Sequence, residues 1–144
     1  MTFENLIRHF STHGLRVSDV RSYLDAGGDV DHHDDRMGYT LLHFAAESSD
    51  AEMVRFLASR GADLQARDRN GWTPLHTATD TDLDTSPRDG LVATDLPTVR
   101  ILLELGADDS ARSTDGKTAR DIARDYRQES LYDSVLRCSA AQPD

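Results

Sequence analysis

The chain has few of the residues that build disulfide-rich, membrane-bound or secreted proteins. Its 144 residues include a single cysteine, Cys138, so an internal disulfide framework is excluded. No apolar run approaches the length needed to cross a bilayer. Residues 1–8 lack the basic segment, apolar stretch and cleavage site of a signal peptide. We therefore expect a cytoplasmic protein with no membrane contact.

Positive charge is also scarce. The chain has 16 basic residues against 26 acidic ones, a formal net charge of −10 at pH 7. A nucleic-acid partner is not expected, because phosphate binding requires a positive surface. A basic protein would instead be steered towards such a chain. The alternative is that the acidity serves solubility alone.

A short motif recurs along the chain. Residues 70–76 read Asn-Gly-Trp-Thr-Pro-Leu-His, and residues 37–43, placed 33 positions earlier, read Met-Gly-Tyr-Thr-Leu-Leu-His. A third copy, Asp-Gly-Lys-Thr-Ala, begins 45 positions later at residue 115. Repetition at this period is typical of a repeat protein.

The pattern around each copy predicts two helices and a turn. We expect one domain, 1–144, with units at about 3–34, 35–67, 68–112 and 113–138 and a tail at 139–144. In the first unit, apolar spacing favours a helix over 3–10 capped by Thr2. In the second, we expect Thr40 to cap a helix, and Ser49 with Glu52 to form a capping box for the next.

The third unit carries an insertion. Thr73 lies 33 positions before Gly106, whereas Thr40 lies only 21 before Gly61, so the third unit is 12 residues longer. The extra residues fall within 80–95, a stretch with five Asp and one Arg. Because loops beyond the usual connection length are either functional or disordered, we interpret this acidic insertion as functional.

The Gly-x-Thr-Pro-Leu-His motif at 71–76, together with Gly-Ala-Asp at 61–63 and 106–108, resembles the ankyrin-repeat family. The resemblance covers residues 3–137, with clear second and third units and degenerate outer ones. It implies an all-α ankyrin-repeat solenoid of about four helix-turn-helix units with projecting finger loops. The second unit departs from the family, since Ser-Ser-Asp at 48–50 replaces its Gly-His.

The sequence offers little for catalysis or metal binding. No nucleophile motif, phosphate-binding loop or zinc spacing is present, so we expect no enzyme activity and no cofactor. His43 and His76 occupy the same repeat position, which favours a hydrogen-bonding brace between units. Two weak metal hypotheses concern His32-His33 with Asp31, Asp34 and Asp35, and a calcium-loop spacing at Asp80, Asp82 and Asp84.

The favoured hypothesis is a protein-binding module. In the resembling family, partners contact the fingertips and the inner helices; the matching fingertip positions here also include Thr114 and Asp115. Tyr, Trp, Met and Arg are enriched at interface hot spots. We expect partner contacts at Arg36, Met37, Tyr39, Glu47, Arg69, Asn70, Trp72, Asp80, Asp82, Asp84, Asp89, Lys117 and Asp125.

The expected mechanism is occlusion. The concave face, finger loops and acidic insertion would cover a basic surface of a protein partner, as an immunity or inhibitor protein covers a toxin. The free chain is expected to be a monomer. The alternatives are a scaffolding or adaptor protein without an inhibitory role and, from another class, a metal-binding protein or small enzyme.

Overall fold

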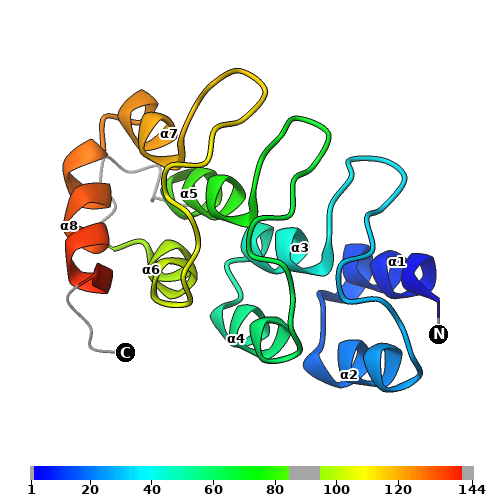
Figure 1. Cartoon of the computed structure of the whole chain (residues 1–144). Coiled ribbons are helices and arrows are strands. Elements are labelled where there is room, and N and C mark those ends of the chain that lie inside the picture. Colours follow the sequence, from blue (N-terminus) through cyan, green and yellow to red (C-terminus); the bar gives the residue numbers. More distant parts are fainter. Residues whose placement is uncertain (1, 85–94, 141–144) are drawn as a thin grey trace.

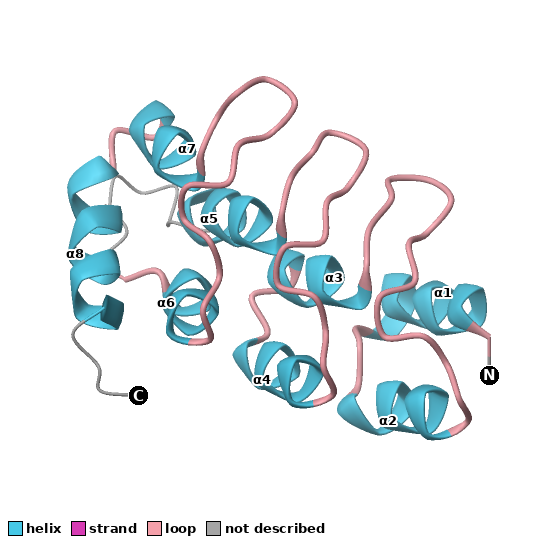
Figure 2. Cartoon of the chain, viewed as in Figure 1, coloured by secondary structure: helices cyan, strands magenta, loops and turns pink. Residues whose placement is uncertain are grey.

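The structure is a computed structural model that describes residues 2–84 and 95–140. These residues form eight α-helices and no strand, which confirms the all-α prediction (Figure 2). The helices are α1 (Phe3–His13), α2 (Val17–Asp25), α3 (Leu41–Glu47), α4 (Ala51–Ser59), α5 (Pro74–Asp84), α6 (Pro97–Glu104), α7 (Ala119–Asp125) and α8 (Glu129–Ala140). No helix in this part of the chain is long and apolar enough to span a membrane.

The helices lie in two rows. Figure 1 shows α1, α3, α5 and α7 side by side as an inner row, with α2, α4, α6 and α8 as an outer row. Three loops project from the stack on the inner-row side. We call them finger 1 (28–40), finger 2 (62–73) and finger 3 (107–118). Each unit contacts its neighbours, so stacking produces one continuous core.

Small residues let the inner helices approach closely. Ala45 and Ala46 on α3 and Ala78 on α5 have no exposed surface. They pack beside larger core residues of the outer row, of which Leu57 and Leu102 are also fully buried. Burial of each large apolar side chain stabilises the stack by roughly 1.5–3 kcal/mol relative to exposure.

Side-chain caps begin helices α1, α3, α4 and α7. The Thr2 hydroxyl accepts a hydrogen bond from the Asn5 amide, and Thr40 accepts one from the His43 amide. The predicted capping box at Ser49 and Glu52 is wrong. Asp50 caps α4, because its carboxylate accepts from the Met53 amide, while Ser49 adopts a positive φ of 52° before the helix begins.

Two helix ends differ from the sequence-based boundaries. Helix α1 continues to His13 instead of ending at Phe10, and terminates at Gly14, whose φ is 76°. Helix α5 does not stop near Ala78 but runs to Asp84, into the insertion. Its last turns are anchored by Leu83, which is 4% exposed, and by the buried Asp82. Packing of these two side chains overrides the low helix propensity of an Asp- and Thr-rich segment.

Candidate protein-binding surface

Histidine braces tie fingers 2 and 3 to the inner helices. His43 Nε2 lies 2.8 Å from the carbonyl oxygen of Trp72, and its Nδ1 accepts from the Thr40 amide at 3.2 Å. His76 makes the same pair of contacts, with the Lys117 carbonyl and the Thr73 amide. Burial lowers the pKa of both imidazoles, which keeps them neutral. The predicted bracing role is confirmed.

The fingers are also joined to one another. The Arg69 amide donates to the Met37 carbonyl, and the Thr114 amide donates to the Asn70 carbonyl, both at 3.0 Å. The Arg69 guanidinium reaches back to the carbonyl of Asp35. The sequence predicts Arg69 and Asn70 as partner contacts. The Arg69 amide and guanidinium and the Asn70 carbonyl instead join neighbouring fingers, while the Asn70 side chain is exposed.

Three predicted anchor residues differ in exposure. Met37, near the tip of finger 1, is 46% exposed. Tyr39 is half-buried, and its ring stacks on His43 with centroids 5.3 Å apart. Trp72 is half-buried with its ring 6.0 Å from that of His76. The Tyr39 ring packs on His43 and the Trp72 ring on His76, so only part of each ring is exposed to a partner.

Acidic side chains recur seven residues after the threonine that precedes each of three inner helices, although in α5 the helix continues past this position to Asp84. Glu47 closes α3, Asp80 lies at the matching position of α5, and Asp125 closes α7. Asp125 forms an ion pair with Lys117, so these two charges largely cancel. Glu47 and Asp80 remain without a basic partner among the described residues.

A tyrosine missing from the sequence-based prediction completes this surface. The Tyr126 hydroxyl, next to the end of α7, donates to Asp80 Oδ1 at 2.9 Å, and the residue is 38% exposed. Burial, with the charges of Asp80 and Asp84, raises the pKa of Tyr126 to about 12. A sequence signal existed, since an aromatic residue follows the third inner-helix carboxylate directly.

Carboxylates on the inner helices affect the pKa of Tyr39 on finger 1. Burial raises the pKa of Tyr39 to about 12, helped by the negative charges of Glu47, Asp68 and Asp80. Desolvation raises the pKa of Glu47 itself. The carboxylates of Glu47 and Asp80 therefore lie close enough to Tyr39 on finger 1 to act on its hydroxyl. We call this region the inner surface and define it by Met37, Tyr39, Glu47, Trp72, Asp80, Asp84, Asp125 and Tyr126.

Asp82 does not belong to the inner surface. It is 6% exposed, and its carboxylate accepts from the amides of Thr98 and Val99 and from the Ser49 hydroxyl. Burial raises its pKa, although the hydrogen bonds from Val99, Thr98 and Ser49 oppose that shift. The prediction of Asp82 as a partner contact is wrong, because its side chain caps α6 from within the fold. Asp89 lies outside the described residues.

The side chains of the two metal hypotheses have other positions and contacts in the structure. Asp80, Asp82 and Asp84 lie on helix α5, where residues two apart point in different directions, so they do not form a calcium loop. His33 Nδ1 lies 2.8 Å from the Gly38 carbonyl, and the His32 ring packs on Phe3 at 4.5 Å. Residues 2–84 and 95–140 contain no group of three or more His, Cys, Asp or Glu placed to hold a metal ion.

Two further predicted residues are exposed on the fingers. Arg36 lies on finger 1, and its guanidinium has no hydrogen bond or ion pair with any described residue. Lys117 lies on finger 3. Its carbonyl oxygen is hydrogen-bonded to His76 Nε2, and its ammonium forms an ion pair with Asp125. Hydrogen bonding to Asp125 raises the pKa of Lys117. Lys117 therefore reduces the local negative charge of the inner surface.

A family model and the relatives with similar sequences all contain ankyrin repeats or match this chain along its repeats. The family model described as ankyrin repeats in three copies matches residues 11–87. Human protein phosphatase 1 regulatory subunit 27 is 39% identical over 93 residues, which is 63% of this chain and 52% of that protein. Human ankyrin repeat and SOCS box protein 6 is 35% identical over 104 residues, 72% of this chain and 22% of that protein. The chain thus spans about half or less of the length of these relatives.

The solved structures agree. The crystal structure of the ankyrin repeat domain of Bcl-3, a member of the IkappaB protein family, superposes with a TM-score of 0.68 at 29% identity, over 84% of this chain and 46% of that one. Ankyrin repeats indicate protein–protein interaction. With its motif, its helix pairs and these matches in agreement, the chain belongs to the ankyrin-repeat family.

Proposed function

We propose that this protein is a non-catalytic binding module that holds a basic segment of a partner protein against the inner surface. The observation that carries the proposal is the carboxylate repeated at the same position of successive inner helices, Glu47 on α3 and Asp80 on α5. Among residues 2–84 and 95–140, no basic side chain forms an ion pair with Glu47 or Asp80, and the charges of both carboxylates act on Tyr39. Lys or Arg side chains of a partner would supply the missing positive charge.

The aromatic residues would add contact area to this charge complementarity. Met37 and Tyr126 are the two large hydrophobic side chains exposed in the described part of the chain, and both belong to the inner surface. Tyr and Trp provide large contacts at small entropic cost and carry much of the energy at interfaces. Partner Arg side chains could also stack on Tyr39 or Tyr126, worth roughly 0.5–2 kcal/mol each.

The finer parts of the sequence-based hypothesis stay predictions. Several relatives are named as regulatory subunits of protein phosphatase 1, which supports a role in controlling another protein through binding. Occlusion of a toxin active site is one form of such control, and scaffolding without inhibition is the other. A monomeric free chain in the cytoplasm, and a contribution from the acidic insertion, belong to the same proposal.

Charge reversal on the two sides of the molecule tests the proposal. Glu47→Arg changes the inner surface at the end of α3, and Glu52→Arg makes the same change on outer helix α4, where Glu52 is also exposed. Immobilised wild type and both variants would capture partners from a native lysate, with quantification by mass spectrometry. The captured partner would then be purified and its affinity measured by calorimetry.

We expect a stoichiometric partner with a basic binding segment. Wild type and Glu52→Arg should bind it alike, while Glu47→Arg should weaken binding about tenfold or more, since like charges across an interface are costly. The difference should shrink as salt rises. Equal binding by Glu47→Arg, or a partner whose contact segment is acidic, would rule out the proposal.

A further inference from the structure

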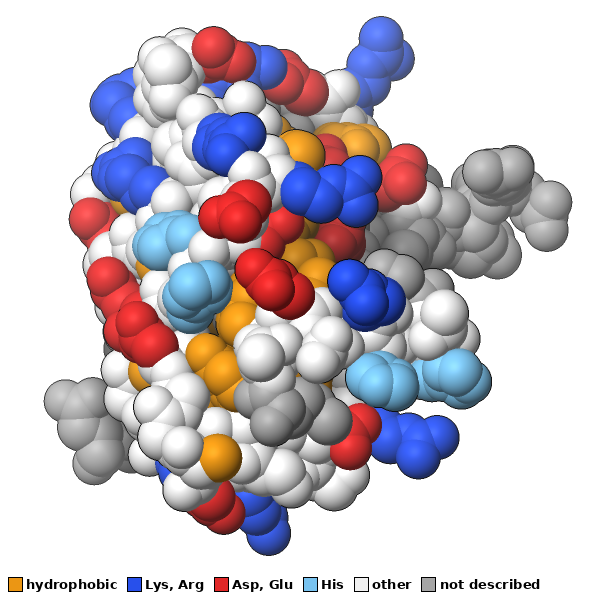
Figure 3. Space-filling view, turned by 90° about the vertical axis from the view of Figure 1, so that its right-hand side faces the viewer, with side chains coloured by type: hydrophobic (Ala, Val, Ile, Leu, Met, Phe, Trp, Pro, Cys, Tyr) orange, Lys and Arg blue, Asp and Glu red, His pale blue; other side chains and the backbone are white. Residues whose placement is uncertain are grey.

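Histidine side chains are exposed at the end of the stack that begins with α1. The chain has six histidines, and two of them, His43 and His76, are the buried braces. Figure 3 looks onto this end and shows histidine side chains gathered at separate places on its surface. Two exposed histidines, His9 and His13, lie on α1 itself. Neutral imidazole is the commonest metal ligand in proteins, so their placement has chemical consequences.

The two histidines of α1 are four residues apart. Residues at this spacing lie on the same face of a helix, about one turn apart, so both imidazoles point to the same side. The helix extends through His13, because the Gly14 amide donates to the Phe10 carbonyl and closes the last turn. Paired histidines at this spacing bind one metal ion in helical zinc sites. The backbone of α1 therefore holds His9 and His13 in a chelating arrangement.

The Thr12 hydroxyl determines which nitrogen of His13 is available. This hydroxyl donates its one hydrogen to the His9 carbonyl at 3.0 Å. His13 Nδ1 lies 2.7 Å from the same oxygen, so Nδ1 carries the ring hydrogen and donates it there. The lone pair of the neutral ring is then on Nε2. Metal-binding histidines have this arrangement, since their other ring nitrogen donates to an oxygen. The His9 ring has no hydrogen bond or ion pair with any described residue.

A hollow of about 320 Å³ lies beside the two rings. It is lined by His9, His13, Gly14, Arg16 and Asp19. Arg16 and Asp19 carry opposite charges, so together they give the hollow little attraction for a cation. The bonds to an ion would therefore come from the imidazole nitrogens. Nitrogen ligands suit Zn²⁺, whereas Mg²⁺ and Ca²⁺ prefer oxygen.

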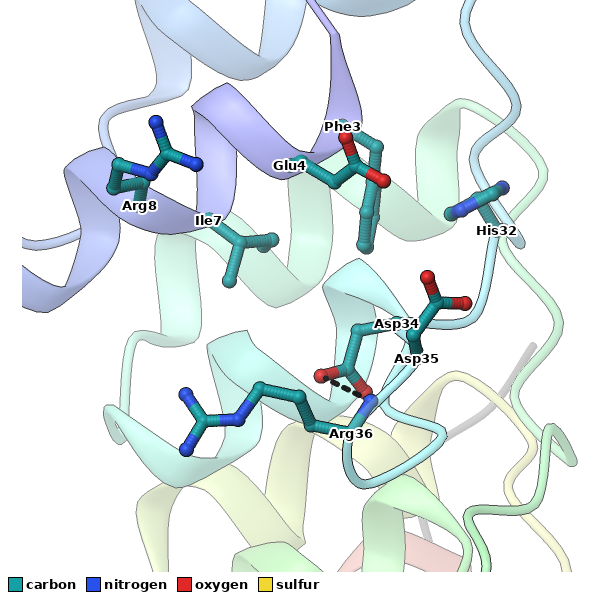
Figure 4. Close-up of a pocket in the computed structure, with 8 residues that line it drawn as sticks. All are labelled: Phe3, Glu4, Ile7, Arg8, His32, Asp34, Asp35 and Arg36. Carbon is teal, nitrogen blue, oxygen red and sulfur yellow. Dashed lines mark hydrogen bonds between the residues drawn. The ribbon is translucent and has the colours of Figure 1, made fainter.

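The other hollow at this end does not offer such a pair. It has a volume of about 370 Å³ and lies between α1 and finger 1 (Figure 4). His32 is the one histidine among the residues that line it, and its ring packs on Phe3. The Asp34 carboxylate there accepts from the amides of Met37 and Tyr39 in its own loop. These groups are engaged within the fold, whereas the ring nitrogens described on α1 are free to bind an ion.

We propose that His9 and His13 bind one Zn²⁺ ion, with His13 contributing Nε2. Zinc in proteins is commonly four-coordinate, so two positions would be filled by water. The site is a pair of ligands, smaller than the groups of three or more that the described residues lack. It is separate from the partner contact proposed above and does not depend on it.

The position of His9 places this ion beside the row of inner-helix carboxylates. His9 stands seven residues after Thr2, as Glu47 stands seven residues after Thr40. The first inner helix therefore has an imidazole where the second has a carboxylate. A bound ion would add positive charge at that end of the row.

Calorimetric titration of the full chain with zinc chloride tests the site, with magnesium chloride as the control salt. We expect saturable binding of one Zn²⁺ per chain and no comparable binding of Mg²⁺. His9→Ala and His13→Ala should each weaken zinc binding about tenfold or more, because one imidazole replaces a chelating pair. His32→Ala is the matched control, since it removes an exposed histidine of finger 1, and it should bind zinc as wild type does.

Long-range nitrogen–proton nuclear magnetic resonance spectra of the imidazoles identify the ligands. Zinc should move the ring resonances of His9 and His13, including Nε2 of His13, and leave those of His32 and His33 in place. The proposal is wrong if zinc binding does not saturate, if His9→Ala and His32→Ala lose affinity equally, or if the shifts appear only elsewhere. One ion for every two chains would make the ion a bridge between copies and would also overturn the proposed site.

Discussion

The carboxylate of Asp82 lies 3.0 Å from the backbone nitrogen of Thr98, so a residue of helix α5 caps helix α6 across the insertion. The residue at the N-cap position of α6, Leu96, has no side-chain acceptor. In the second unit the equivalent function is local, since Asp50 caps α4. The Asp82 carboxylate also accepts a hydrogen bond from the Ser49 hydroxyl, and this contact joins the third unit to the second.

Loss of this carboxylate should destabilise the fold. Asp82→Ala leaves two buried amides without an acceptor, and we expect the free energy of unfolding to fall by about 2–4 kcal/mol. Asp84→Ala, two residues later on the exposed side of α5, should change it by less than about 0.5 kcal/mol. Chemical denaturation of both variants measures the difference. Equal stability of the two variants would contradict the capping role.

The histidine braces should make stability depend on pH. The pKa of His43 and that of His76 lie below the ordinary value of 6.5, mainly through burial. Because the folded state binds the proton less tightly than the unfolded state, the stabilisation is complete above pH 6.5 and is lost as pH falls through the lower folded pKa values. Protonation also removes the acceptor for the Thr40 amide.

Denaturation at a series of pH values below 7 checks this effect. Wild type should lose stability steadily as the pH falls, and His43→Gln should show a smaller loss from a lower starting value. His9→Gln, a change at an exposed histidine of α1, should follow wild type. A slope unchanged by His43→Gln would mean that other groups cause the acid sensitivity.

Finger packing should distinguish two glycines of similar conformation. Gly71 has φ 73°, and a Cβ there would lie 2.7 Å from the Thr114 backbone nitrogen; Gly116 has φ 79° with nothing within 4 Å. Gly116→Ala should cost about 1 kcal/mol from the left-handed backbone alone. Gly71→Ala should cost about 3 kcal/mol, because finger 3 must also move. Thermal unfolding of both variants compares them, and similar losses would argue against tight finger packing.

The contact between Tyr126 and Asp80 should be visible in a titration. The pKa of Tyr126 lies at about 12, with Asp80 as one cause besides burial. Asp80→Asn removes that charge, so we expect the Tyr126 pKa to move down towards 10. Asp115→Asn, on the exposed finger 3, should leave it in place. Ultraviolet absorbance, corrected by the Tyr126→Phe variant, follows this ionisation. An unmoved pKa would show that the two side chains do not meet in solution.

Much of the fold could be predicted from the sequence because each unit repeats the same local chemistry. The threonine cap of α3 and the bracing histidines depend on spacings of three residues within a motif, so Thr40, His43 and His76 could be assigned from their positions alone. The same regularity placed Glu47, Asp80 and Asp125 at equivalent repeat positions, but the prediction that each lies at a helix end is wrong for Asp80, because α5 continues to Asp84.

The rest depended on contacts between residues far apart. Asp82 looked like one more carboxylate of an acidic loop, because the backbone amides of α6 that donate to it lie beyond the insertion and follow no period. Ser49 looked like a cap, although its hydroxyl is directed to Asp82 and Asp50 performs the capping. Tyr126 lies outside the repeated motif and gains its place only through Asp80 of the preceding unit.

The central claim is that a partner binds the inner surface. Amide hydrogen exchange of the chain alone and in complex with the captured partner tests it most directly. We expect slower exchange at residues 37–40 and 70–73 and at the ends of α3, α5 and α7, with little change on α2, α4 and α6. Protection confined to those outer helices, with the inner surface unchanged, would contradict the claim.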